Sequence, residues 1–268
     1  TNRQAEITVL GNESYSEYSK CGLPYVIGGI IPSFDDLIEF PPSWFQHFKI
    51  NLKLENEVYD IDPEGKIVKS ISLKDAEKEE HQYDALIVAT GANSWIPEIK
   101  GAFLDEGRLK EGIFTLRTMD DARQILKQAE KGKKAMIVGS GSIGMEIAEA
   151  LSRRGMKTYV RLRTHMLTGM IDEDMAAIVE RGAEEHGMHF IPRVTVSEIG
   201  DREKVKYVVL RNVDTEEESE YPVDLVIISA GSKARVEVAE KAKCQIGSTG
   251  GIVIDKECKT SVKDIYAA

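Results

Sequence analysis

One stretch near the middle of the chain constrains the fold more than any other. Residues 133–163 read KKAMIVGSGSIGMEIAEALSRRGMKTYVRLR. The apolar run at 135–138 has the length of a buried parallel strand, and Gly139, Gly141 and Gly144 follow it at the G-x-G-x-x-G spacing. In that motif the first glycine allows a tight turn, the second admits a pyrophosphate, and the third lets the helix pack on the strand.

The residues after these glycines complete a strand, helix, strand unit. Four apolar residues recur at helical spacing: Ile143, Ile147, Ala150 and Leu151. Gly155 is placed to end this helix, and residues 158–162 supply a second strand. The amides and dipole of the helix N-terminus would face the phosphates. The unit therefore predicts dinucleotide binding, and the alternative is a glycine-rich turn without a ligand.

Composition limits the kinds of molecule that the protein is expected to bind. The 268 residues suit one large or two ordinary domains, and 42% hydrophobic content allows proper cores. With 45 acidic against 35 basic residues, the net charge of −10 argues against nucleic acid or an anionic membrane as partner. No apolar run approaches the ~20 residues of a membrane span, and no signal peptide precedes the first strand, so we expect a cytoplasmic protein.

The three cysteines are widely spaced, at Cys21, Cys244 and Cys258, which argues against a disulfide framework and for a reducing compartment. Cys21 is followed by glycine and proline in a segment that should lead into a helix or turn. Helix N-termini favour the thiolate form of cysteine, which makes Cys21 a candidate reactive thiol. The alternative is a small buried apolar residue, a common role for cysteine. Cys244 and Cys258 match no motif, and we expect them to be structural.

The segment SEYSKCGLPYVIGG around Cys21 resembles the single-cysteine signature of the pyridine nucleotide-disulfide oxidoreductases. The similar subgroup contains coenzyme A-disulfide reductases, NADH oxidases and NADH peroxidases. The resemblance continues through five further segments and covers essentially the whole chain: PPSWFQHFKINLKLENEVYDIDPEGKIV, DALIVATGA, GSGSIGMEIAEAL, DLVIISAGSKA and TSVKDIYAA.

The resemblance implies an α/β fold with two nested Rossmann-like domains, each built on a parallel sheet. The FAD-binding domain would occupy residues 1–115, the NAD(P)-binding domain 116–242, and a return segment of the FAD domain 243–268. The family's first glycine loop would lie before Thr1. We therefore expect an internal fragment with an incomplete FAD domain, and a homodimer in the full-length protein.

The resemblance also assigns roles to residues. Cys21 would be the catalytic thiol, and Lys20 and Lys49 would bind the substrate, although a lysine at position 49 could simply be solvated. Around NAD(P) it places the three glycines with Ser142, Ile143, Glu146, Arg163, Ala230 and Gly231. Around FAD it places Val58, Ala89, Thr90 and Gly91. It implies no metal.

The strand at 158–162 ends in Arg161-Leu162-Arg163, without the carboxylate that would accept the ribose hydroxyls of NAD. A guanidinium offers paired donors that match a phosphate. Arg163 therefore favours NADPH, with NADH still possible, and the alternative is an ordinary surface arginine.

By resemblance, hydride would pass from NADPH to FAD, and electrons from FAD to Cys21 held as a mixed disulfide or sulfenic acid. A single cysteine suits an external sulfur or peroxide acceptor. The leading expectation is reduction of a small-molecule disulfide, with coenzyme A disulfide or a persulfide as substrate. The alternatives are an NAD(P)H oxidase or peroxidase, and a non-catalytic nucleotide-binding fragment.

Patterns elsewhere predict further elements. We expect an aromatic-rich helix after Pro41-Pro42, a hairpin turned at 62–65, and a helix over 118–131 with Thr118 as its N-cap. We expect residues 74–82 and 97–116 to be connections. A helix over 173–186 should stop at Gly187. The remaining strands are expected at 6–10 (buried), 85–88, 190–198, 205–212, 221–229, 250–254 and 265–268.

Overall fold

The computed structural model describes residues 5–104 and 107–268. Contacts divide the chain into two compact units. The first, here called the hairpin unit, consists of Thr1–Tyr18, Ile38–Asn93 and Lys233–Ala268. The second, the glycine-turn unit, consists of Ser19–Leu37 and Ser94–Ser232. The domains expected from motifs have other limits, since contacts group 19–37 and 94–115 with the glycine turn. The division at 115 and 242 stays a prediction.

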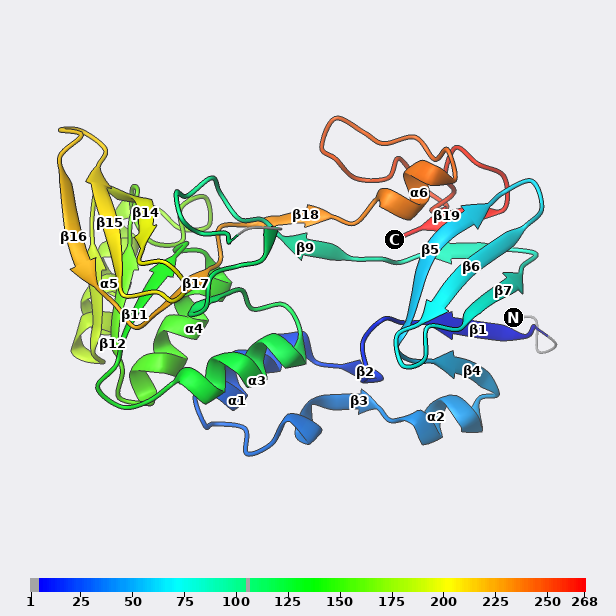
Figure 1. Ribbon diagram of the computed structural model, residues 1–268, viewed down its shortest axis with the longest axis horizontal. Helices are drawn as coiled ribbons and strands as arrows, with labels where there is room; N and C mark the ends of the chain where they lie inside the picture. The colour runs from blue at the N-terminus through cyan, green and yellow to red at the C-terminus, as the bar shows by residue number, and fades with distance from the viewer. Residues whose placement is uncertain (1–4, 105–106) are drawn as a thin grey trace. The chain divides into compact units, whose positions relative to one another are not determined.

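The main sheet of the glycine-turn unit has five parallel strands in the order β10-β17-β11-β12-β13 (Figure 1). Their bounds are β10 Ile113–Phe114, β11 Lys134–Val138, β12 Lys157–Arg161, β13 Met188–Ile191 and β17 Leu225–Ile228. All four residues of β17 are buried, as are the last four of β11. Continuous burial explains the unbroken apolar runs of these strands and is typical of parallel sheets between helices. The predicted α/β class is confirmed.

The helices of this unit are α1 Leu23–Ile27, α3 Met119–Gln128, α4 Ser142–Arg153 and α5 Glu173–Glu185, with 3-10 turns η1 Lys20–Gly22 and η2 Phe34–Leu37. The predicted N-cap of α3 is confirmed. The Thr118 hydroxyl accepts a hydrogen bond from the Asp121 amide at 3.1 Å, and the Asp121 carboxylate accepts one from the Thr118 amide at 3.0 Å. Gly187, with φ +86°, follows α5 as expected.

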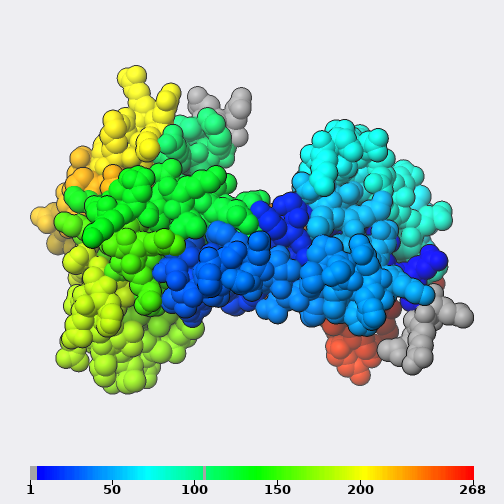
Figure 2. Space-filling view, turned by 90° about the horizontal axis from the view of Figure 1, so that it is seen from below, coloured from blue at the N-terminus to red at the C-terminus, as the bar shows by residue number. Residues whose placement is uncertain are grey.

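A three-stranded antiparallel sheet, β14-β15-β16, completes the unit, and the turn between β15 and β16 reaches its surface (yellow in Figures 1 and 2). The bounds are β14 Val194–Gly200, β15 Tyr207–Asn212 and β16 Glu218–Pro222. Two predicted strands were wrong because each is two strands. The stretch 190–198 breaks at Arg193, whose φ is +59°. The stretch 221–229 breaks where Asp224 leaves the antiparallel sheet and accepts the Lys134 amide at 2.7 Å.

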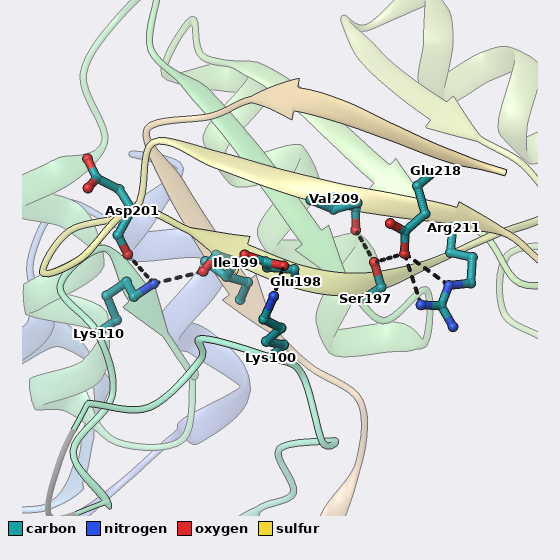
Figure 3. A network of polar contacts seen from close by, with 9 residues as sticks. All are labelled: Lys100, Lys110, Ser197, Glu198, Ile199, Asp201, Val209, Arg211 and Glu218. Carbon is teal, nitrogen blue, oxygen red and sulfur yellow. Dashed lines mark hydrogen bonds and ion pairs between the residues drawn. The ribbon is translucent and has the colours of Figure 1, made fainter. Parts of the chain in front are cut away.

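Residues 97–104 and 107–112 form the expected irregular connection, whereas the end of the predicted connection 97–116 contains β10. Polar contacts attach the connection to β14 (Figure 3). The Lys100 amide donates to the Ser197 carbonyl at 3.2 Å, and the Ile199 amide donates to the Lys100 carbonyl at 2.8 Å. The buried Lys110 donates through Nζ to the carbonyls of Ile199 at 2.7 Å and Asp201 at 2.6 Å (Figure 3). Burial lowers the pKa of Lys110. Lys110 is thus the main buried polar anchor of this connection.

The hairpin unit contains the antiparallel sheet β5-β6-β7, with bounds β5 Asn56–Asp62, β6 Ile67–Ser72 and β7 Lys78–Gln82. The predicted hairpin is confirmed, and Asp62 Oδ1 accepts the amides of Glu64 and Gly65 at 3.0 Å. The predicted connection at 74–82 was wrong, because β7 pairs with β6 through its backbone. Its charged sequence alternates between exposed and half-buried positions without apolar residues, so the hydrophobic pattern of a strand is missing.

Three short parallel or antiparallel pairs belong to this unit: β1 Ile7–Leu10 with β4 Ile50–Lys53, β8 Leu86–Val88 with β19 Ile265–Ala267, and β2 Glu17–Tyr18 with β3 Ile38–Phe40. Its helices are α2 Pro42–His47 and α6 Glu237–Lys241, and α2 begins at Pro42, one residue before the predicted start. Strands β9 Ala92–Ser94 and β18 Ser232–Ala234 pair where the chain passes between the units.

The strand at β1 was predicted correctly, but the prediction that it is buried was wrong, since Ile7 is 50% exposed. Residues 250–254 form a loop rather than the predicted strand.

Within the described part of the chain, no helix is both long and apolar enough to cross a membrane. The same residues contain no group of three or more His, Cys, Asp or Glu side chains arranged to hold a metal ion.

Candidate functional site: the glycine turn and the thiol segment

The glycine turn lies between β11 and α4, and its backbone geometry requires glycine at two positions. Gly139 has φ +134°, and a Cβ there would lie 2.3 Å from the Ser229 carbonyl oxygen. A Cβ at Gly144 would lie 1.9 Å from the Gly139 carbonyl oxygen. Such distances exclude any side chain at either position. The turn is therefore tight for the reason that the sequence motif predicts.

Gly141 differs from the other two glycines because it faces open space. No atom lies within 4 Å of a Cβ built at Gly141, and the residue is the N-cap of α4. Ser142 and Ile143 beside it are exposed. The first amides of a 12-residue helix thus meet open space without a capping side chain. This arrangement fits a bound pyrophosphate, because it combines free N–H donors with the positive end of the helix dipole.

The carboxyl end of β17 closes the other side of the turn. Val138 and Ile228 are opposite one another in the sheet, and the Ser229 amide donates to the Val138 carbonyl at 2.9 Å. The Ser229 hydroxyl donates to the Gly139 carbonyl at 3.1 Å. Ala230 is half-buried and Gly231, with φ +135°, is exposed. The structure therefore brings the predicted pair Ala230-Gly231 to the same sheet edge as the glycine turn.

The carboxyl end of β12 lies at this edge too, since Val138 is also opposite Arg161. At this strand end, where an NAD-selective carboxylate would lie, Leu162 is 2% exposed and Arg163 is exposed. The loop that follows is tied to the glycine turn, because the Leu167 amide donates to the Ser140 carbonyl at 2.7 Å. That hydrogen bond was not predictable from the motif, and it fixes the arginine-bearing loop beside the turn.

Cys21 lies in η1, immediately before α1, and is an exposed free thiol. The alternative of a buried apolar cysteine therefore does not hold. Lys20 beside it is also exposed. A Cβ at Gly22 would lie 2.3 Å from Leu37 Cδ2, so a glycine lets the thiol turn approach η2.

Helix α1 packs against α4, the helix that opens from the glycine turn. The Arg154 Nε donates to the Ile27 carbonyl at 2.6 Å, and a Cβ at Gly28 would lie 3.2 Å from Ala150 Cα. Sequence reasoning missed Arg154, which looks like an ordinary helix-terminal arginine. These contacts place the thiol segment and the glycine turn in one packed unit.

Glu146 lies on α4 in a small pocket between α1 and α4. The pocket is lined by Pro24, Tyr25, Gly28, Ile30, Glu146, Glu149, Ala150 and Arg153. Burial raises the pKa of Glu146, and the charge of Glu149 raises it further. Glu146 thus holds a proton to higher pH than an ordinary glutamate.

The residues expected near FAD lie in the hairpin unit, where they are described by themselves. Val58 is half-buried on β5, Ala89 is exposed, and the Thr90 hydroxyl donates to the Arg235 carbonyl at 2.5 Å. The Arg235 amide donates in turn to the Gly91 carbonyl at 2.9 Å. Arg235 Nε donates a hydrogen bond to Asn93 Oδ1, which lies 142 residues earlier in the sequence. Sequence reasoning missed Arg235 because its partners are so distant along the chain.

Lys49 also belongs to the hairpin unit. It follows α2 with φ +57° and is exposed. The structure brings it into no contact that defines a role, so substrate binding by Lys49 stays a prediction.

Comparison with known proteins supports this interpretation of the glycine turn. The family model described as "Pyridine nucleotide-disulphide oxidoreductase" matches residues 1–268. An NADH oxidase of Methanocaldococcus jannaschii is 36% identical over 99% of this chain and 57% of its own length. An NAD(P)H sulfur oxidoreductase (CoA-dependent) of Pyrococcus furiosus is 33% identical over 98% of the chain and 56% of its own length.

Among solved structures, an NAD-dependent persulfide reductase from A. fulgidus superimposes with a TM-score of 0.89 and 34% identity. The match covers 100% of this chain and 48% of the reductase chain. The chain thus spans about half the length of the relatives it matches. The match of the family model over the whole sequence, together with the glycine turn, shows that this chain belongs to the pyridine nucleotide-disulphide oxidoreductase family.

Proposed function

We propose that this chain carries the dinucleotide and thiol centres of an FAD-dependent NAD(P)H oxidoreductase that reduces a low-molecular-weight disulfide, such as coenzyme A disulfide or a persulfide. The observation that carries the proposal is the packing of the Cys21 segment on α4, the helix that opens from the glycine turn. The relatives add support, since one is named an NAD(P)H coenzyme A polysulfide/persulfide reductase, from Pyrococcus horikoshii.

The glycine turn would bind the pyrophosphate of NAD(P)H. The open face of Gly141 admits the phosphates, and the first amides of α4 donate to them. Ala230 and Gly231 would line the same edge, and Glu146 would lie near the nicotinamide. Bound NAD(P)H and FAD would supply hydride and electron transfer, which the protein residues cannot perform themselves.

Cys21 would act on the acceptor. Its thiolate would attack one sulfur of a disulfide RS–SR, forming a Cys21–S–SR mixed disulfide and releasing RS⁻. Two electrons from the cofactors would then cleave the mixed disulfide and restore the thiolate with release of the second RS⁻. Cys21 is the only cysteine in the sequence of the glycine-turn unit, so an internal disulfide within that unit is impossible. An external sulfur acceptor fits this arrangement.

The remaining assignments belong to the same proposal. Val58, Ala89, Thr90 and Gly91 would contact FAD, with the Thr90-Gly91 turn held by the main chain of Arg235. Lys20 and Lys49, both exposed, would bind anionic groups of the substrate. The whole protein would be a cytoplasmic homodimer.

We also propose a preference for NADPH. The exposed Arg163 lies in the segment attached to the glycine turn, and the strand end Arg161-Leu162-Arg163 offers no carboxylate to bind the ribose of NADH. A guanidinium matches the doubly charged 2′-phosphate of NADPH.

A second candidate is an NAD(P)H oxidase or peroxidase in which Cys21 cycles through a sulfenic acid. It is favoured by the M. jannaschii relative, which is named an NADH oxidase. A third candidate is a non-catalytic nucleotide-binding module, which would need only the open glycine turn and the first amides of α4.

The test uses the full protein, its visible flavin spectrum, and anaerobic NADPH consumption with coenzyme A disulfide. We expect bound flavin and turnover that Cys21→Ser abolishes. Cys258→Ser is the matched control, because Cys258 is also an exposed free thiol. Turnover with oxygen or peroxide alone would favour the oxidase. Nucleotide binding without flavin would favour the non-catalytic module.

A further inference from the structure

Helix α5 presents its larger apolar side chains to solvent instead of to the sheet. The structure describes the whole helix, and the residues that it buries are the small Ala176 and Ala183. Met175, Ile178 and Val179 are between 43% and 56% exposed, and the helix lies at the surface of the glycine-turn unit (yellow-green in Figure 2). Their i, i+3, i+4 spacing puts the three side chains on one face, here called the α5 stripe. A contiguous exposed apolar surface of this kind indicates an interaction site.

Gly182 continues the α5 stripe by one turn, and the fold of the chain itself does not explain this glycine. It lies in the interior of a 13-residue helix, where glycine is less favourable than alanine. Its backbone is not in the left-handed region, and a Cβ built on it meets no atom of a described neighbour within 4 Å. No neighbour within the described part of the chain therefore requires the missing side chain. A glycine on an exposed helix face suits the close approach of another molecule.

Asp174 and Arg181 supply opposite charges along one border of the α5 stripe. They are seven residues apart, which is about two helical turns, so both lie on the same side of the helix. Arg181 Nε donates to the Ala177 carbonyl of its own helix at 3.3 Å, and no carboxylate within the described ranges 5–104 and 107–268 forms an ion pair with this arginine. In two such helices that lie antiparallel, Asp174 of each approaches Arg181 of the other. The border of the stripe is therefore complementary in charge to a second copy of itself.

The other acidic residues of α5 affect such a pair less. Helical periodicity places Glu173 and Glu184 on the side opposite the α5 stripe. Glu180 Oε1 accepts the Met166 amide at 3.0 Å, which turns this carboxylate toward the preceding loop. Glu185 lies at the end of the helix and would face the acidic N-terminus of an antiparallel neighbour, which limits the strength of the pair.

We infer that α5 pairs with α5 of a second copy of this chain, antiparallel about a two-fold axis between Ile178 and Val179. In this arrangement Met175 of each copy lies over Gly182 of the other, and each contact occurs twice. The inference goes beyond the proposed function, because the pair needs neither a cofactor nor the thiol. A single pair of helices is a small interface, so we expect association in the micromolar range.

The test is sedimentation equilibrium of the full protein over a series of concentrations. Ile178→Asp should halve the mass of the wild-type assembly, because it places a charge at the apolar centre of the pair. Leu73→Asp is the matched control, since Leu73 is 52% exposed but lies after β6 in the hairpin unit, and it should leave the mass unchanged. Both variants should bind NADPH as the wild type does, which shows that the glycine-turn unit is intact.

Charge reversal tests the antiparallel register. Asp174→Arg and Arg181→Asp should each weaken the association at least about fivefold, because each creates two pairs of like charges. The variant that carries both substitutions should recover most of the loss, since opposite charges meet again. Gly182→Ala separates pairing from folding. It should weaken the association by filling the space under Met175, and it should raise the unfolding temperature, because alanine favours the helix.

Two outcomes would overturn the inference. In one, the wild type and Ile178→Asp have the same mass at every concentration, so the α5 stripe joins no second copy. In the other, the double charge variant associates no better than either single variant, so the two helices do not meet in the antiparallel register. None of these residues belongs to the proposed nucleotide or thiol site, so either outcome leaves the proposed function as it stands. Failure of the wild type to bind NADPH would count against the proposed function alone.

Discussion

The Ser229 hydroxyl donates a hydrogen bond to the Gly139 carbonyl oxygen at 3.1 Å, joining two residues that are 90 positions apart. The bond closes the turn from the side of β17 and leaves Gly141 facing open space. The three glycines of the motif therefore have different tolerances to a side chain, which can be measured separately.

Gly144→Ala should destabilise the fold, whereas Gly141→Ala should impair only nucleotide binding. A Cβ at position 144 meets the Gly139 carbonyl at 1.9 Å, so the backbone must shift, and overpacking of this kind costs about 1–3 kcal/mol or more. A Cβ at 141 meets no protein atom, but it occupies the space proposed for the pyrophosphate. Denaturant unfolding and NADPH titration of both variants provide the comparison. Equal NADPH affinity in Gly141→Ala and the wild type would place the pyrophosphate elsewhere.

The proposed role of Arg163 predicts at least about tenfold tighter binding of NADPH than NADH in the wild type, as expected for a charged hydrogen-bonded pair. Arg163→Ala should erase the difference by weakening NADPH alone, because NADH has no 2′-phosphate. The affinities can be measured by calorimetry or fluorescence titration. If the wild type binds both nucleotides equally, the preference for NADPH is wrong.

Lys110→Met should lower the free energy of unfolding by about 1–3 kcal/mol, because two carbonyls at the end of β14 lose their buried donor. Lys100→Met is the matched control from the same network. Its side chain is 78% exposed and paired with Glu198, so we expect a loss below about 1 kcal/mol. A larger loss for Lys100→Met than for Lys110→Met would contradict the anchoring role of Lys110.

The lowered pKa of Lys110 also gives this variant a pH dependence. Between the lowered native pKa and the ordinary value of 10.5, the unfolded state binds more protons than the native state. Wild-type stability therefore gains with rising pH across this window, and Lys110→Met lacks the gain. The difference in unfolding free energy between the two proteins should widen from neutral to alkaline pH. A constant difference would show that the native and unfolded pKa values are alike.

The raised pKa of Glu146 predicts a change of stability with pH that is opposite in sign to that of Lys110. Above the ordinary value of 4.5 and up to the raised native pKa, the native state binds more protons than the unfolded state, so stability falls as pH rises. Glu146→Gln should remove this fall, and Glu149→Gln should reduce it by removing the neighbouring charge. Urea unfolding across mildly acidic to neutral pH measures the effect. Parallel profiles for the wild type and Glu146→Gln would rule it out.

Thiol accessibility makes a prediction that needs no cofactor. Cys21 and Cys258 are exposed, whereas Cys244 is 5% exposed and its Sγ lies 3.6 Å from Thr260 Oγ1. A thiol reagent should modify two residues in the folded protein and a third after unfolding. Mass spectrometry of the labelled peptides identifies them. Rapid labelling of Cys244 in the folded state would show that this part of the hairpin unit opens readily.

The sequence was most informative where local chemistry determines the structure. The cap of α3 depends on Thr118 and Asp121 alone, and the apolar run of β11 allows only a buried strand. It was least informative where main-chain hydrogen bonds or a residue distant in sequence determine whether a strand forms or ends. β7 is held by main-chain pairing despite its charged side chains, and the break at Arg193 comes from a left-handed residue that is not glycine.

The candidate site shows the same division. The glycines, Ala230 and Arg163 could be identified from motifs, because their spacing along parallel strands brings them to one sheet edge. Arg154, Ser229 and Leu167 could not, since each acts through hydrogen bonds to main-chain carbonyls that are distant in sequence. The buried Nε of Arg161 makes no hydrogen bond within the described part of the chain, a feature that only the structure reveals.

The contact between Arg154 and Ile27 bears on how this protein can be dissected. The thiol segment comes from the start of the chain but rests on α4, so residues 94–232 expressed alone would expose the surface around Ala150 that α1 covers. A transplant of the nucleotide-binding module into another protein would have to include residues 19–37. Exchange of one centre without the other would meet the same obstacle, because the covering helix and the helix it covers come from different parts of the chain.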